Sequence, residues 1–126
     1  MNESTSGPDN HTSTTARASL AAKLSDGHTV VTSELTPPKG IDLEPLISKA
    51  KSLGEHVDAF NLTDSHNARM SLSPVVAAHH LHAAGFEPIV QFTTRDRNRI
   101  ALQGDLLGVA SLGLPNVVLM GGDNPK

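Results

Sequence analysis

Cysteine, tryptophan and tyrosine are absent from this sequence, and only three of its 126 residues are phenylalanine. The lack of cysteine excludes a disulfide framework and thiolate chemistry. With three aromatic rings the core has to be aliphatic, and stacking on protein aromatics is a poor route to ligand binding. No apolar run approaches the roughly 18 residues of a transmembrane helix, and no basic start with an apolar core marks a secretory signal. We therefore expect a cytoplasmic protein with no membrane association.

The charge of the chain is close to balanced. Ten Lys and Arg residues stand against 13 Asp and Glu residues, so the formal net charge is −3 and the pI is near 6.1. This balance does not favour a nucleic acid or an acidic membrane as a partner. Residues 1–16 are rich in Ser, Thr and Asn, which predicts a disordered polar tail. Residues 17–126 are expected to form the folded part.

Four apolar, strand-like runs recur at intervals of roughly 30 residues, and each ends in polar residues. Helix patterns separate them, with Asp42, Ser73 and Asp96 as expected N-caps and Gly27, Gly54, Gly85 and Gly113 as expected stops. The runs are Thr29–Glu34, Val57–Asp64, Pro88–Thr94 and Asn116–Asp123, and the predicted helices cover about 17–24, 43–53, 74–84 and 97–112. Strands alternating with helices in this way predict parallel βα units with right-handed crossovers.

The turn after the first strand decides between the parallel α/β architectures. A dinucleotide-binding doubly wound domain would have a glycine-rich turn there, whereas this chain has Glu34–Gly40 with two prolines. A (β/α)₈ TIM barrel fits better, because it collects polar residues from the ends of several strands. Such a barrel needs about 250 residues. We therefore expect the chain to cover about the first four βα units, the N-terminal half of a longer barrel, since half a barrel leaves two unpaired edges.

Glu34 is the first candidate for chemistry. A carboxyl group at the end of a Val-Val strand, next to Thr36 and two prolines, is expected to lie in a partly desolvated mouth. Desolvation favours the protonated form, which a general acid requires. The alternative is a strand-end glutamate paired with a surface lysine such as Lys39, and residue type alone favours that alternative.

Gly121, Gly122 and Asp123 follow the fourth strand. The two glycines would let the backbone approach a flat or phosphorylated ligand, and Asp123 could accept hydrogen bonds from it. A tight turn leaving the strand explains the same composition equally well.

Two other clusters carry charge or metal-ligating groups. Arginines in the stretch Arg95–Arg99 oppose the dipole at a helix N-terminus, so we expect at least one to be held by a ligand anion or a neighbouring carboxylate. A solvated charge cluster is the alternative for Arg97 and Arg99. His79, His80 and His82 lie in mid-helix with no completing ligand, so we expect packing or solvent-facing histidines and no metal site.

Together, the strand ends resemble those of the methylenetetrahydrofolate reductase family, which are flavin-dependent (β/α)₈ barrels. The resemblance runs from about Thr29 to Lys126. It rests on four segments that occur in order at the expected strand ends. These are Ser33–Pro38, Asn61–Asp64, Gln91–Asn98 and Leu119–Pro125.

The resemblance implies an oxidoreductase in which NAD(P)H passes a hydride to FAD, and the flavin passes it to 5,10-methylenetetrahydrofolate to give 5-methyltetrahydrofolate. It assigns Glu34 as the acid that helps to open the folate's imidazolidine ring, and Asp123 as a group near the flavin and the pterin. Thr63 matches a flavin-contacting threonine. Gln91 stands where well-known members have a flavin-contacting histidine, and Gly121 where they have an arginine.

Two rival hypotheses remain open. One is a different TIM-barrel enzyme, an aldolase or a phosphate-ester enzyme, although no strand ends in the lysine that an aldolase would use. The other is a non-catalytic half-barrel that serves as a binding or assembly module. We expect the chain alone to be inactive, and homo-oligomer formation is also left open by the sequence.

Overall fold

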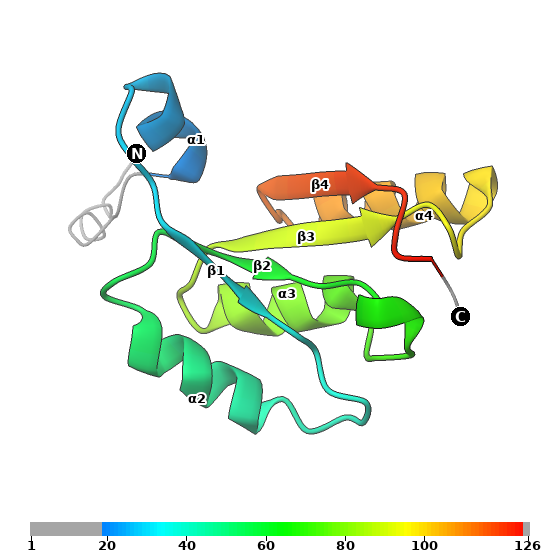
Figure 1. Ribbon diagram of the computed structural model, residues 1–126. Helices are drawn as coiled ribbons and strands as arrows, with labels where there is room; N and C mark the ends of the chain where they lie inside the picture. Colours follow the sequence, from blue (N-terminus) through cyan, green and yellow to red (C-terminus); the bar gives the residue numbers. More distant parts are fainter. Residues whose placement is uncertain (1–18, 125–126) are drawn as a thin grey trace, which may run out of the picture.

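The computed structural model describes residues 19–124, which form one four-stranded parallel sheet with helices between the strands (Figure 1). The predicted polar tail lies outside the described residues. The strand order is β1-β2-β3-β4, so each strand pairs with its neighbours in sequence. In chain order the elements are α1 Leu20–Ser25, β1 Thr32–Leu35, α2 Glu44–Leu53, β2 Ala59–Leu62, the 3₁₀ turn η2 His66–Ala68, α3 Pro74–Ala83, β3 Pro88–Thr93, α4 Arg99–Ser111 and β4 Asn116–Met120.

Most of the predicted helix boundaries are confirmed. Ser73 caps α3 by accepting a hydrogen bond from the Val75 N–H, and Gly85 and Gly113 follow their helices with positive φ angles of 97° and 71°. The prediction that Asp96 caps the fourth helix is wrong. Asn98 caps α4 instead, because the Asp96 carboxylate is bound to the guanidinium of the preceding residue.

The cap of α2 also differs from the prediction. Leu43 occupies the N-cap position and makes no side-chain cap bond. The Asp42 carboxylate accepts a hydrogen bond from the Glu44 N–H, two residues further along the chain. Asp42 therefore still satisfies a free amide of the first turn, from outside the cap position.

The two faces of the sheet have different chemistry. On one face the strands present Leu35, Phe60, Leu62, Val90 and Phe92, and this face forms the main core with side chains of α2, α3 and α4. Figure 1 shows these three helices along that side of the sheet. Because side chains alternate along a strand, the residues between them face the opposite way.

The opposite face is polar toward the carboxyl ends of the strands. The register places Glu34 beside Asn61 and Gln91 beside Val118. A parallel sheet in sequential order, with α2 to α4 on one face, confirms the α/β class and is compatible with part of a (β/α)₈ barrel. It differs from the doubly wound arrangement, in which the strand order reverses and helices cover both faces.

Helix α1 lies at the amino-terminal end of the strands (Figure 1). The Glu87 carboxylate accepts hydrogen bonds from the Leu20 N–H and from the Asn116 side chain, which links α1 to the start of β4. Leu20 packs with Ala59 and Ile89 in a small second cluster. Helix α1 therefore covers this face of the sheet at the amino-terminal ends of the strands, away from the polar carboxyl ends.

Strand β4 is largely exposed within the described part of the chain. Val117, Val118, Leu119 and Met120 keep between 37% and 56% of their surface accessible. In the fourth helix, Leu102, Leu106 and Val109 pack against the core, whereas Leu112, at the next position of the same spacing, is exposed. Leu112 is exposed because it lies beyond the last turn of α4, as its C-cap.

Gly54, at the end of α2, and Gly104, within α4, differ in the space around them and provide a test of close packing. A Cβ at Gly54 would lie 2.8 Å from the Phe86 ring and 3.2 Å from the Ala50 carbonyl oxygen, whereas a Cβ at Gly104 would meet nothing within 4 Å. We predict that Gly54→Ala lowers the free energy of unfolding by about 1–3 kcal/mol through overpacking. Gly104→Ala should raise it by about 0.5–1 kcal/mol, because alanine is the better helix former.

Urea denaturation of the two variants measures both changes. Equal effects of the two substitutions would contradict the close packing of Gly54 on Phe86, the ring that also packs edge-on against Phe60 with centroids 5.7 Å apart.

Candidate functional site

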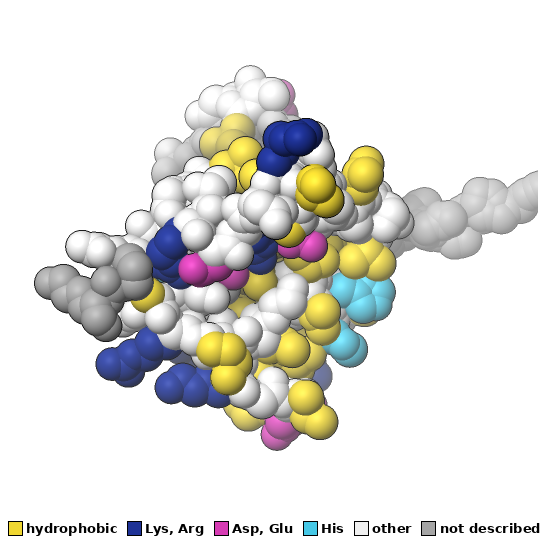
Figure 2. Space-filling model, turned by 90° about the vertical axis from the view of Figure 1, so that its right-hand side faces the viewer, with side chains coloured by type: hydrophobic (Ala, Val, Ile, Leu, Met, Phe, Trp, Pro, Cys, Tyr) yellow, Lys and Arg dark blue, Asp and Glu magenta, His cyan; other side chains and the backbone are white. Residues whose placement is uncertain are grey.

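A cavity of about 410 Å³ lies at the carboxyl ends of the strands. Its walls come from all four strands and from the turns that follow them. The lining residues are Glu34, Thr63, Asp64, His66, Asn67, Gln91, Thr93, Met120, Gly122 and Asp123. Figure 2 looks at this end of the molecule and shows acidic side chains directly beside basic ones near its middle. Of the six residues predicted for the site, only Gly121 is not among the lining residues.

Glu34 reaches the cavity from the end of β1, but it is exposed. The partial desolvation expected from the sequence is therefore not present in the described chain, because β1 is an edge strand with no neighbour on its outer side. The alternative of a Glu34–Lys39 ion pair does not occur among residues 19–124 either. Glu34 also lines a second cavity of about 360 Å³, which lies between β1 and α2.

Thr63 and Gln91 form the buried wall of the cavity. Thr63 is 3% exposed and Gln91 is 8% exposed. The Thr63 hydroxyl oxygen is buried and has no hydrogen-bond partner within the described part of the chain. Because a buried hydroxyl without a partner is costly, a ligand atom bound in this cavity would relieve that cost.

The turn after β4 approaches the end of β3 closely. Gly122 has φ = +90°, and a Cβ at this position would lie 3.0 Å from a terminal nitrogen of Arg95 and 3.2 Å from the Thr93 Cβ. Glycine is therefore required at Gly122 by both backbone conformation and space. Gly121 has open space around its Cα and carries no such requirement.

Asp123 joins the turns that follow three strands. Its carboxylate accepts a hydrogen bond of 2.9 Å from the Asn67 N–H in η2, and its carbonyl oxygen accepts one of 2.7 Å from Arg95. Ser65, Asn67 and Ala68 all have positive φ angles, so the segment that Asp123 holds is strained. Asp123 therefore stabilises the turn, as the alternative interpretation expects, and its side chain also lines the cavity.

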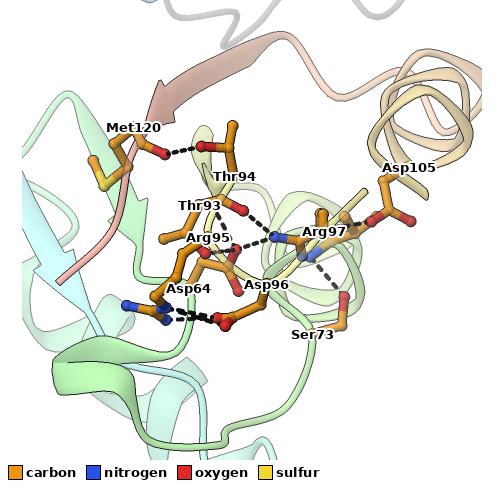
Figure 3. A network of polar contacts seen from close by, with 10 residues as sticks. Asp64, Ser73, Thr93, Thr94, Arg95, Asp96, Arg97, Asp105 and Met120 are labelled. Carbon is orange, nitrogen blue, oxygen red and sulfur yellow. Dashed lines mark hydrogen bonds and ion pairs between the residues drawn. The ribbon is translucent and has the colours of Figure 1, made fainter. Parts of the chain in front are cut away.

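The sequence indicates Asp64 only as part of a strand end, whereas in the structure it is the centre of a polar network (Figure 3). Its Oδ2 accepts hydrogen bonds from the Thr93 N–H at 2.9 Å, from the Thr93 hydroxyl at 3.2 Å and from Arg97. Arg97 also donates to the Asp105 carboxylate at 2.8 Å and lies over the Phe92 ring, 4.9 Å from its centroid. Burial opposes the charge of Arg97, but the hydrogen bonds to Asp64 and Asp105 outweigh it and raise the Arg97 pKa.

The neighbouring pair Arg95–Asp96 is more open to solvent. The Arg95 guanidinium donates to the Asp96 carboxylate, and this hydrogen bond raises the Arg95 pKa and lowers the Asp96 pKa. The prediction that a neighbouring carboxylate holds at least one of these arginines is therefore confirmed. A purely solvated cluster is wrong for Arg97, because Asp64 and Asp105 bind it.

The comparison with protein families decides the relationship of the chain. A family model described as methylenetetrahydrofolate reductase matches residues 19–126. The chain belongs to the methylenetetrahydrofolate reductase family. This membership supports a function like that of a methylenetetrahydrofolate reductase, with oxidoreductase chemistry on folates in one-carbon metabolism, in a family that is generally flavin-dependent. A search of curated proteins found no match to the chain.

Two further features are absent from the described residues. No group of three metal-ligating side chains occurs among residues 19–124, and His79, His80 and His82 are exposed on α3. In the same range, no helix has the length and hydrophobicity needed to cross a membrane.

The buried and exposed ion pairs of this region should respond differently to the loss of charge. Asp64→Asn leaves Arg97 with only Asp105 as its charged partner, so we predict a loss of about 3 kcal/mol in the free energy of unfolding, as for a broken buried pair. Asp96→Asn should lower the free energy of unfolding much less, because the Asp96 side chain is 53% exposed and Arg95 keeps its hydrogen bond to the Asp123 carbonyl oxygen.

Chemical denaturation at neutral pH measures both variants. A midpoint for Asp64→Asn that matches that of Asp96→Asn would contradict the role of Asp64 as the centre of the network.

Proposed function

We propose that this chain supplies four of the eight βα units of an FAD-dependent methylenetetrahydrofolate reductase. In this proposal NAD(P)H is the electron donor, 5,10-methylenetetrahydrofolate is the substrate, and 5-methyltetrahydrofolate is the product. The observation that carries the proposal is the convergence of Glu34, Thr63, Gln91 and Asp123 on one cavity. Glu34, Thr63 and Asp123 match the family's strand-end motifs, and Gln91 stands where well-known members have a histidine. The four residues come from the ends of all four strands.

The residues present fit a flavin. The unpartnered Thr63 hydroxyl offers a hydrogen bond to a heteroatom of a bound ring, and the Gln91 amide can both donate and accept. Gly122 keeps the turn after β4 free of a side chain, so that the backbone can approach a flat ligand. When bound, FAD would accept a hydride from NAD(P)H and deliver it to the folate.

Glu34 is proposed as the proton donor of the folate step. As the C–N bond of the five-membered ring opens, the Glu34 carboxyl would give its proton to the departing nitrogen. The side chain lies at the open edge of the sheet, where a further strand beside β1 would cover it. Such cover would supply the desolvation that favours the protonated form.

Asp123 is proposed to act mainly through position. Its carboxylate is held by the Asn67 N–H, so the negative charge stays at one place on the cavity wall. A fixed carboxylate there would orient hydrogen-bond donors of the pterin or the flavin.

A non-catalytic assembly module is the second candidate. It is favoured by β4, whose apolar side chains are exposed and whose outer edge has no partner strand in the described chain. A complete barrel would account for the same exposure, since a fifth strand would pair with β4.

We predict that the 126-residue chain by itself retains no FAD. The cavity is walled by four strands on one side and is open beyond β1 and β4, so a bound flavin would keep much of its surface in water. Purified chain at micromolar concentration should show no flavin absorbance after desalting. A stoichiometric yellow protein would contradict this prediction and favour self-assembly of two half-barrels.

The catalytic assignment is tested by Glu34→Gln in the complete barrel. The amide keeps the size and hydrogen bonding of the side chain but cannot transfer the proton. We expect flavin reduction by NAD(P)H to survive, and flavin reoxidation by methylenetetrahydrofolate to slow by roughly 10²–10⁴-fold.

Stopped-flow absorbance records the two half-reactions separately. The matched control is Glu55→Gln, an exposed glutamate that lines neither cavity, which should leave both half-reactions unchanged. Unchanged folate-driven reoxidation in Glu34→Gln would end the catalytic assignment, and equal loss of both half-reactions would indicate a structural role.

A further inference from the structure

Asp64 can only accept hydrogen bonds. Its side chain is 6% exposed, and its carboxylate forms an ion pair with Arg97. A carboxylate has no proton to donate, so in each hydrogen bond to Oδ2 the partner group must be the donor. The Thr93 hydroxyl, 3.2 Å from that oxygen, therefore directs its only proton at Asp64.

This direction of the hydrogen bond changes what Thr93 offers to the cavity. A hydroxyl group has one proton and two acceptor lone pairs. With the proton committed to Asp64, the hydroxyl can offer only lone pairs to the cavity that Thr93 lines. The Thr93 N–H also bonds to Asp64, which fixes the end of β3 and with it the position of the hydroxyl.

Thr63 provides the contrast on the neighbouring strand. Its hydroxyl has no partner among the described residues, so it can donate or accept. The two threonines of the cavity are thus not equivalent: the one at the end of β2 adapts to a ligand, and the one at the end of β3 is set as an acceptor.

We propose that Thr93 is a specificity-determining residue that accepts a hydrogen bond from a ring N–H of the ligand, and that Asp64 is the positioning residue that sets this polarity. The inference rests on the proposed function. Flavins and pterins share the required chemistry, because both carry a cyclic N–H next to a carbonyl group. Ligands without that N–H would place a lone pair or an alkyl group against the Thr93 lone pairs and bind less tightly.

The polarity itself is tested without a ligand, by NMR of the chain, whose mass is 13.2 kDa. A Thr93 hydroxyl proton that is buried and bonded to Asp64 should exchange slowly with water and give its own resonance. A hydroxyl proton in fast exchange would overturn the inference whether or not a ligand binds.

Recognition is tested by NMR titration with soluble probes, because shift changes detect binding too weak to survive desalting. FMN and 3-methyl-FMN carry the same ring with and without the N–H, and 5-formyltetrahydrofolate supplies the pterin. The variants are Thr93→Val, which keeps the shape and removes the hydroxyl, and Thr93→Ser, which restores it.

We expect the dissociation constant of 3-methyl-FMN to exceed that of FMN, and Thr93→Val to reduce their ratio by roughly two- to tenfold, the contribution of one hydrogen bond. Thr93→Ser should recover the ratio. The methyl group has the same steric effect in the unmodified chain and in both variants. A change in the ratio of the two dissociation constants between them therefore reports the hydrogen bond alone.

If only 5-formyltetrahydrofolate binds more weakly to Thr93→Val and recovers with Thr93→Ser, the N–H belongs to the pterin. If FMN and the folate both bind but neither responds to the valine, the inference is wrong while the proposed function stands. If neither ligand shifts the cavity residues of the unmodified chain, the recognition by Thr93 is overturned, whereas the proposed function, which concerns the complete barrel, is decided separately by the stopped-flow half-reactions.

Discussion

The carboxylate of Asp64 holds the end of β3 and the segment before α4 against the end of β2, and the shape of the cavity depends on these contacts. One oxygen accepts from the backbone and hydroxyl of Thr93 and from Arg97. Two residues close to this network in sequence form the buried wall of the cavity. They are Thr63, which precedes Asp64, and Gln91, which lies two positions before Thr93. Without Asp64, the Arg97 guanidinium and the Thr93 hydroxyl would each lose a hydrogen-bond partner in a largely buried region.

The same network explains how the chain tolerates Arg95 and Arg97 just before α4. Positive charge near a helix N-terminus is unfavourable, because the free N–H groups already carry partial positive charge. Here each of the first two arginines is matched by carboxylates: Arg95 by Asp96, and Arg97 by Asp64 and Asp105. Arg95 also donates to the Asp123 carbonyl oxygen, so the charge that opposes the helix connects the turns after β3 and β4.

The open edges of the sheet link the fold to the proposed chemistry. In the described chain Glu34 lies on the edge strand β1 and Met120 on the edge strand β4, at opposite sides of one cavity. In a closed barrel both would have neighbouring strands, and the apolar residues of β4 would be covered. The proposed role of Glu34 as a proton donor therefore depends on a neighbouring strand that would cover it.

The order and type of the elements follow from the sequence alone, because helix caps, glycine stops and apolar runs are local signals. Ser73, Gly85 and Gly113 act as their types predict. The sequence also indicates Thr63, Gln91, Gly122 and Asp123 as site residues, since residues that follow parallel strands meet at the carboxyl ends of the sheet. The cap of α4 and the role of Asp64 were decided only by the tertiary structure. Whether Asp96 binds a helix amide or Arg95, and whether Arg97 meets water or a carboxylate 33 positions earlier in the chain, depends on distances that exist only after β2 and β3 have paired.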